Sequence, residues 1–167
     1  MKHLLVAACL FVVLPMKQAP AVPLKACLGR NLGARADFQG ATGAQEGGVV
    51  LRNRTEASCM LSGHAVIDFV VRGETRPLPV RVAAGRDTHG RLHDRTILLA
   101  PGQRAFVHAH WSNWCGEVSR KIEVRLWLRS VEPRVHVRGG ISTPRCDDSA
   151  GSSRVAIGPY ERVRRYR

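Results

Sequence analysis

The stretch NRTEASCMLSG, residues 53–63, sets a polar run directly before a cysteine and a glycine, between the apolar runs VVL and AVIDFVV. Polar side chains of this kind bond their own backbone in turns, so the stretch predicts a loop that joins two strands. The residues that supply this polarity are Asn53, Thr55, Glu56 and Ser58. A disulfide at Cys59 would then hold this loop between the two strands in place. Asn53 also begins a glycosylation acceptor, which matters only in a eukaryotic secretory route.

The N-terminus is typical of a secretory signal peptide. An apolar run at residues 4–14 follows Lys2, and Ala19-Pro20-Ala21 supplies the small residues that a signal peptidase requires. This run is shorter than the roughly 20 residues that a membrane-spanning helix needs. We therefore expect a secreted or cell-envelope protein with no transmembrane span after cleavage. Its parts would be a signal peptide at 1–21, one domain at 22–160 and a basic tail at 161–167.

The use of cysteine agrees with export. Cys9 would leave with the signal peptide, unless it is lipidated, and four cysteines would remain. Exported cysteines form disulfides, and four of them allow three connectivities. We favour Cys27 with Cys59 and Cys115 with Cys146, at separations of 32 and 31 residues. Each bridge would stabilise the fold by roughly 3.5 to 4 kcal/mol. Zinc is the poorer explanation, because no two cysteines have the close spacing of structural zinc sites.

The chain is strongly basic, with 26 Lys and Arg against 13 Asp and Glu, a net charge of +13. Loss of Lys2 and Lys17 with the signal peptide would lower this charge to +11. Such an excess favours anionic partners. An alternative is codon usage, because 22 of the 26 basic residues are arginine, a bias that a GC-rich genome produces without any functional demand.

Apolar residues beyond residue 30 alternate or run for four to eight positions between turn residues, which predicts an all-β fold. We expect an antiparallel β-sandwich of about seven to nine strands. The expected strands are 34–38, 48–52, 65–71, 78–83, 95–99, 104–111, 121–129, 134–139 and 154–158. Pro101-Gly102 predicts a tight turn that links two of them.

One hairpin can be followed residue by residue. In KIEVRLWLR, residues 121–129, four apolar side chains share one face and a charged set with Trp127 shares the other. A four-residue loop at 130–133 would place Arg129 opposite Arg134, Trp127 opposite His136 and Arg125 opposite Arg138. These six residues form a candidate strip that binds anions or a partner, because arginine holds phosphate and carboxylate in a bidentate fork. The alternative is ordinary solvation of an exposed charge row.

The order of several segments resembles a known family. Cys27, VVLRN, CMLSG, LLAPGQRA, Trp111 with Cys115, and Cys146 follow one another as in a secreted actinobacterial four-cysteine family classed as domain of unknown function 4232. The resemblance covers about residues 27–159, although Ala65 stands where that family has proline. It implies an exported, disulfide-bonded, immunoglobulin-like β-sandwich, often a cell-envelope protein, with no assigned activity.

Catalytic patterns are not found in the sequence. It has no G-x-S-x-G elbow, no His-Glu-x-x-His helix and no phosphate-binding glycine loop followed by Lys. His108 and His110 would share one face of a strand, which makes half of a Zn or Cu site. His89 and His93 are possible further ligands that nothing in the sequence brings close.

We therefore expect a non-enzymatic binding module without a cofactor. Its partners would be an anionic cell-wall polymer or an envelope protein. Nucleic acid is not expected as a partner, because export argues against it and the usual recognition motifs are missing. The alternative is a metal-binding protein or enzyme centred on His108 and His110.

Overall fold

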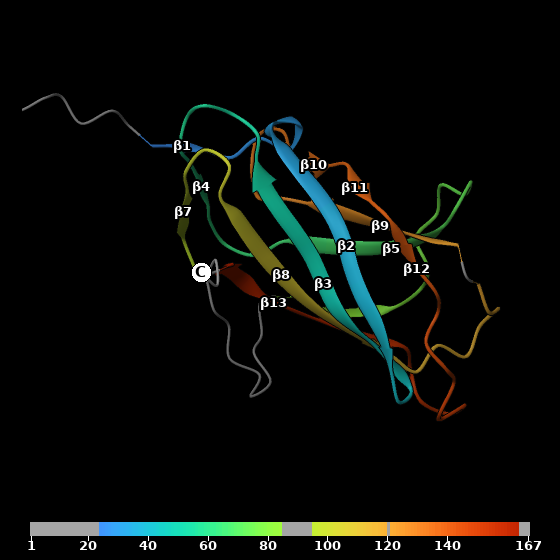
Figure 1. Ribbon diagram of the computed structural model, residues 1–167. Helices are drawn as coiled ribbons and strands as arrows, with labels where there is room; N and C mark the ends of the chain where they lie inside the picture. The colour runs from blue at the N-terminus through green and yellow to red at the C-terminus, as the bar shows by residue number, and fades with distance from the viewer. Residues whose placement is uncertain (1–23, 85–94, 120, 164–167) are drawn as a thin grey trace, which may run out of the picture.

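The computed structural model describes residues 24–84, 95–119 and 121–163 (Figure 1). Their regular structure is β-strand, apart from one 3-10 turn, η1 (Gly29–Asn31). The expected signal peptide, His89, His93 and the last four residues of the expected tail lie outside the described residues. None of the described residues forms a helix long and apolar enough to cross a membrane.

The largest sheet has six strands in the order β11-β2-β3-β8-β13-β6. Their bounds are Val137–Arg138 (β11), Leu32–Ala41 (β2), Ala44–Asn53 (β3), Arg104–Ser112 (β8), Arg154–Arg162 (β13) and Arg81–Ala84 (β6). A tight turn joins β2 to β3, where Gly43 has a φ of +70°, a conformation that suits glycine. The paired strands β2, β3 and β8 form the front layer in Figure 1.

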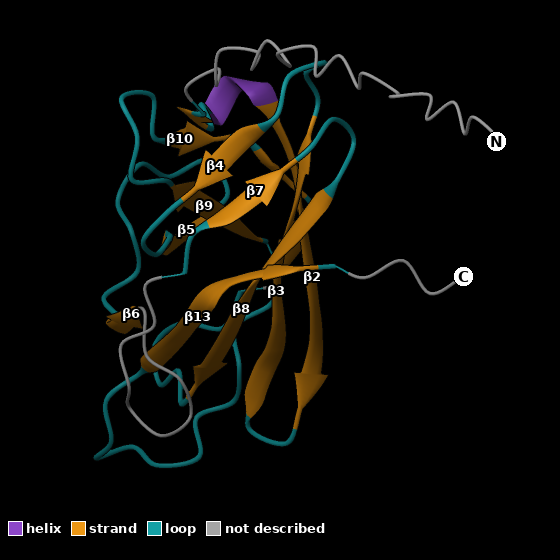
Figure 2. Ribbon diagram, turned by 90° about the vertical axis from the view of Figure 1, so that its left-hand side faces the viewer, coloured by secondary structure: helices purple, strands orange, loops and turns teal. Residues whose placement is uncertain are grey.

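Two smaller sheets complete the fold. In one, β9 (Ile122–Trp127) pairs with β10 (Arg134–Val135), β12 (Gly140–Ile141) and β5 (Val66–Val71). In the other, β4 (Cys59–Leu61) lies between β1 (Lys25–Ala26) and β7 (Ile97–Leu99). This second sheet lies at one end of the molecule (Figure 1). Figure 2 shows β5, β9 and β10 on the opposite side of the molecule from β2 and β3.

The core fills the space between the six-stranded sheet and the β9 sheet. Alternate residues of β8 are buried and half-buried along the strand, so this strand turns one apolar face inward. Phe69 of β5 stacks on Trp111 of β8 with ring centroids 4.4 Å apart, which joins the two layers directly. Other members of the shared core are Val49, Leu51, Val107, Ile67, Ile122, Val124 and Leu126.

The all-β class and both favoured disulfides are confirmed. Three pairings are parallel, however: β1 with β4, β11 with β2, and β13 with β6. The described residues form thirteen strands rather than seven to nine, because several strands are only two or three residues long. The strand β13 continues through Arg162, two residues into the segment expected to be a tail.

Asn53 holds the end of β3 through a buried network. Its side chain is 1% exposed. Its amide nitrogen donates to the carbonyls of Ala57 (2.7 Å) and Leu99 (2.9 Å), and its amide oxygen accepts from the backbone and hydroxyl of Thr55. The Asn53 backbone also accepts from Gly102 N and donates to the carbonyl of Gln103. This amide is therefore fully engaged in the folded protein and is closed to glycosylation.

The two disulfides differ in exposure. Cys27 is 2% exposed and Cys59 is 9% exposed, and the backbone N–H of Cys27 donates to the carbonyl of Met60. Cys115 and Cys146, by contrast, are both exposed. The first bridge therefore belongs to the core, whereas the second joins surface segments.

Replacing Asn53 should destabilise the fold strongly. We expect Asn53→Ala to lower the free energy of unfolding by about 2 to 3 kcal/mol, because it leaves the buried carbonyl of Leu99 without its donor and removes the bonds to Ala57 and Thr55. Urea denaturation followed by tryptophan fluorescence measures this change. The matched control is Asn31→Ala, which should cost less than about 1 kcal/mol. Equal losses in the two variants would contradict the role of the Asn53 network.

The two bridges should also differ in reactivity. Limited reduction of the folded protein, followed by alkylation and peptide mass mapping, should label Cys115 and Cys146 before Cys27 and Cys59. The reason is that a reducing thiolate must reach a sulfur atom, and burial denies it access to the first bridge. Earlier labelling of Cys27 and Cys59 would show that the N-terminal bridge opens more readily than its burial allows.

Candidate functional site

The predicted hairpin forms, but with a different register. Arg134 lies opposite Trp127 and Val135 lies opposite Leu126. The expected pairs Arg129 with Arg134, Trp127 with His136 and Arg125 with Arg138 are therefore wrong. The reason is a longer connection: β9 ends at Trp127, and the Leu128 N–H closes the loop by donating to the carbonyl of Pro133.

The segment that was expected to be one strand at 134–139 is divided between two sheets. β10 pairs with β9, then β11 pairs in parallel with β2, placing Arg138 beside Arg35. β12 returns to β9, with Gly140 opposite Glu123. Gly139 has a φ of +87° between these strands, which allows the chain to turn back. The segment thus crosses from one layer to the other and back.

This crossing creates an open groove of about 360 Å³. Its charged and polar lining consists of Arg72, Glu123, Arg125, Arg134, His136 and Arg138. The groove collects four of the six residues of the predicted strip. Arg72 was missed, because it follows β5 and no local pattern links it to β9. The pairing of β5 with β9 brings the loop that carries Arg72 to the groove.

Two of the groove arginines have partners within the protein. Arg125 donates to the carbonyls of Thr75 and Glu74, each at 2.9 Å, and so holds the turn after β5. Arg72 Nε lies 3.5 Å from the Glu123 carboxylate. Asp68 lies directly opposite Arg125; burial raises its pKa, and the positive charge of Arg125 offsets only part of that rise.

The other three groove residues are exposed: Arg134, His136 and Arg138. Within the described part of the chain, their side chains have no hydrogen bond or ion pair. Their donors are therefore available to a ligand, in contrast to those of Arg125 and Arg72.

The remaining two strip residues lie outside the groove lining. Trp127 is half-buried at the end of β9, between Val66 on one neighbouring strand and Arg134 on the other. Arg129 lies against Gly63, where a Cβ atom would come within 3.0 Å of its Cδ. The predicted strip is thus one cluster around the groove plus two residues at its end.

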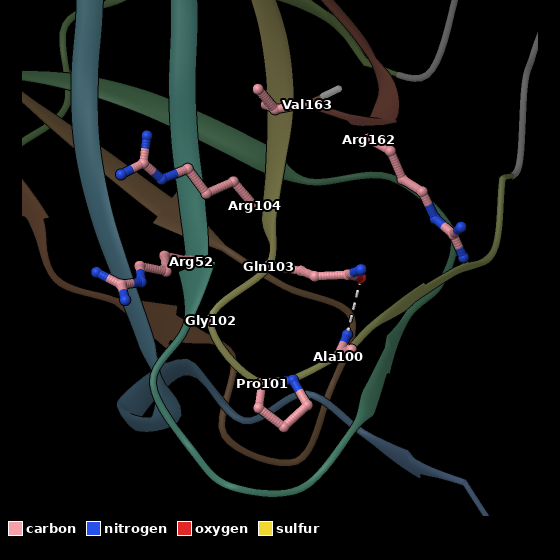
Figure 3. Close-up of a pocket in the computed structure, with 8 residues that line it drawn as sticks. All are labelled: Arg52, Ala100, Pro101, Gly102, Gln103, Arg104, Arg162 and Val163. Carbon is pink, nitrogen blue, oxygen red and sulfur yellow. Dashed lines mark hydrogen bonds between the residues drawn. The ribbon is translucent and has the colours of Figure 1, made fainter. Parts of the chain in front are cut away.

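A second basic surface surrounds the Pro101-Gly102 turn. This turn links β7 to β8 as predicted, with Gly102 at a φ of +70° and a bond from Gln103 N to the carbonyl of Ala100. Its open pocket of about 980 Å³ is lined by three arginines, Arg52, Arg104 and Arg162 (Figure 3). Figure 3 shows Arg52 and Arg104 extending to one side of β8 and Arg162 to the other.

The two histidines of β8 share one face, as predicted, and a carboxylate lies between them. Glu46 on β3 binds His108 Nε2 through Oε1 at 2.5 Å and His110 Nδ1 through Oε2. Burial alone would raise the pKa of Glu46, but the bonds and charges of the two histidines together hold it below its ordinary value. Among the described residues, no group of three potential ligands is arranged to hold a metal ion.

Fold and surface together define an all-β, disulfide-bonded domain with two arginine-lined surfaces. The chain belongs to the family described as Domain of unknown function (DUF4232), whose model matches residues 27–157. This confirms the family that the sequence resembles. Comparison with curated proteins gave no match, and comparison with solved structures gave none.

The low pKa of Glu46 makes stability depend on pH. A carboxyl whose pKa is depressed in the folded state stabilises the fold above its unfolded pKa, and this contribution is lost as pH falls through the folded pKa. We expect Glu46→Gln to lose less stability than the wild type on acidification from about pH 5 to about pH 3. Urea denaturation at a series of pH values measures both curves. Equal losses of stability in the two proteins on acidification would show that Glu46 does not contribute to the pH dependence of stability.

Proposed function

We propose that this protein is an exported, non-enzymatic binding module that holds anionic polymers of the cell envelope in the groove formed by β9, β10 and β11. One observation carries the proposal. Among the described residues, Arg134, His136 and Arg138 line a common groove without internal partners, while Arg125 and Arg72 beside them are held by the protein. The groove thus combines fixed walls with available donors.

The chemistry of these side chains indicates the ligand class. Arginine binds phosphate and carboxylate through two parallel N–H bonds, and histidine adds a further donor. An open groove suits a segment of a long chain better than an enclosed small molecule, since small-molecule sites bury most of their ligand. The net charge, +13 for the whole chain and +11 after loss of the signal peptide, favours encounter with a polyanion and makes that encounter sensitive to salt.

Export belongs to the same proposal. The two disulfides favour an oxidising compartment, because intracellular thiols are kept reduced. The N-terminal sequence supplies the features of a signal peptide. An immunoglobulin-like sandwich, which the family resemblance implied, would suit such a module, with its sheets as a scaffold and its surface as the site.

Neutralising the available groove arginines should weaken polymer binding. We expect Arg134→Gln/Arg138→Gln to bind an immobilised anionic polymer such as polyglutamate roughly five- to tenfold more weakly at low salt. Surface plasmon resonance at several salt concentrations measures the affinity and its salt dependence.

The matched control is Arg81→Gln/Arg154→Gln, which removes two exposed arginines that face each other on β6 and β13. It should bind within about twofold of the wild type. Equal weakening of both variants would mean that net charge alone governs binding and would reject the groove. Stoichiometric micromolar zinc binding that disappears in His108→Ala/His110→Ala would favour the metal-binding alternative instead.

A further inference from the structure

Three arginine side chains lie over three neighbouring strands on the outer face of the six-stranded sheet, the face turned away from the core. Arg52 of β3 and Arg104 of β8 are directly opposite each other, and both are exposed. Figure 3 shows both extending to the same side. Arg54 lies over β2, because a Cβ atom on Gly33 would come within 2.9 Å of its Nε, and Gly33 is the β2 partner of Arg52. We call these residues the arginine row.

The arginine row has no internal compensation. Within the described residues, none of its three guanidinium groups forms an ion pair or hydrogen bond, and Glu56, which lines a neighbouring hollow with Arg52 and Arg54, binds neither. Arg35, two residues after Gly33 on β2, differs because it forms an ion pair with Asp37 at 3.1 Å. Like charges directly opposite on a sheet destabilise it. A ligand that neutralises the row would therefore relieve a repulsion already present in the protein.

The backbone beneath the row is held firmly. Asn53, between Arg52 and Arg54, is fixed by its buried amide and by backbone bonds to Gly102 and Gln103. Arg54 N donates to the carbonyl of Asn31, and Arg104 accepts a bond from Val163 N. Positions that are fixed before binding lose less entropy when a ligand arrives. Gly33 supplies the space that the Arg54 side chain occupies.

We propose that the arginine row is a second anion site, which binds oxyanion groups carried in series on one chain that crosses β2, β3 and β8. Neighbouring strands lie about 4.8 Å apart, so successive guanidinium groups meet successive phosphate or carboxylate groups along such a chain. A single phosphate or carboxylate carries less charge than the three guanidinium groups together. This site is separate from the hairpin groove, and substitutions of its own residues test it.

The test compares the row with a matched pair of arginines. Arg52→Gln/Arg104→Gln should weaken binding to inorganic polyphosphate or to polyglutamate by roughly five- to tenfold at low salt. Arg81→Gln/Arg154→Gln loses the same charge from another facing pair and should bind within about twofold of the wild type. Thermal denaturation confirms that each variant is folded. Isothermal titration calorimetry measures the affinities.

The outcomes separate the explanations. A stronger loss with polyphosphate identifies phosphate groups as the ligand, and a stronger loss with polyglutamate identifies carboxylates. Unchanged binding of the row variant, or equal weakening of the control, overturns the site. Equal affinity for inorganic phosphate and for polyphosphate, at matched anion concentration, overturns the claim of groups in series. Arg134→Gln/Arg138→Gln, measured in parallel, reports on the groove alone, so failure of one site is distinguishable from failure of the other.

Discussion

The structure depends on closure at the point where β3 ends, which Asn53 and the Cys27–Cys59 bridge bring about together. Three segments meet there: the loop before β4, the end of β7 and the turn into β8. Their backbone groups cannot all pair with one another as strands do, and a buried carbonyl without a donor costs free energy. The Asn53 amide donates to the carbonyls of Ala57 and Leu99 and accepts from Thr55, and its backbone bonds to Gly102 and Gln103. An apolar residue of similar size would leave the buried carbonyl of Leu99 without this donor.

This closure also positions the exposed chemistry. Strand alternation sets Asn53 inward, and the residues on either side of it, Arg52 and Arg54, face outward. The rigidity of the buried amide therefore extends to two of the three arginines in the row. In the groove, Arg125 stabilises the backbone in a similar way, because its bonds hold the turn after β5 against β9. In the groove, an arginine that stabilises the fold lies beside arginines whose side chains have no partner among the described residues. In the arginine row, the arginines without partners lie next to a buried residue that stabilises the fold.

Local pattern predicted much of this fold. The alternation at residues 122–128 matches the observed burial, the Pro101-Gly102 turn lies where expected, and the favoured cysteine pairs are bridged. Local pattern could not predict the pairing of segments that lie far apart in the sequence. The course of residues 134–141 depends on β2, a strand about 100 positions earlier, so the hairpin register could not follow from its own sequence. Glu46 reaches His108 and His110, and Arg52 reaches Arg104, only through the β3–β8 register.

The buried bridge near the beginning of the domain also bears on how the molecule responds to mechanical tension. Strands β2 and β3 lie wholly within the covalent loop closed by Cys27 and Cys59, 32 residues apart. If the chain is pulled from its two ends, that loop cannot be drawn out, which withholds roughly 110 Å of contour length from extension. The hairpin that carries Arg52 would remain a closed ring even after the sheets had been pulled apart.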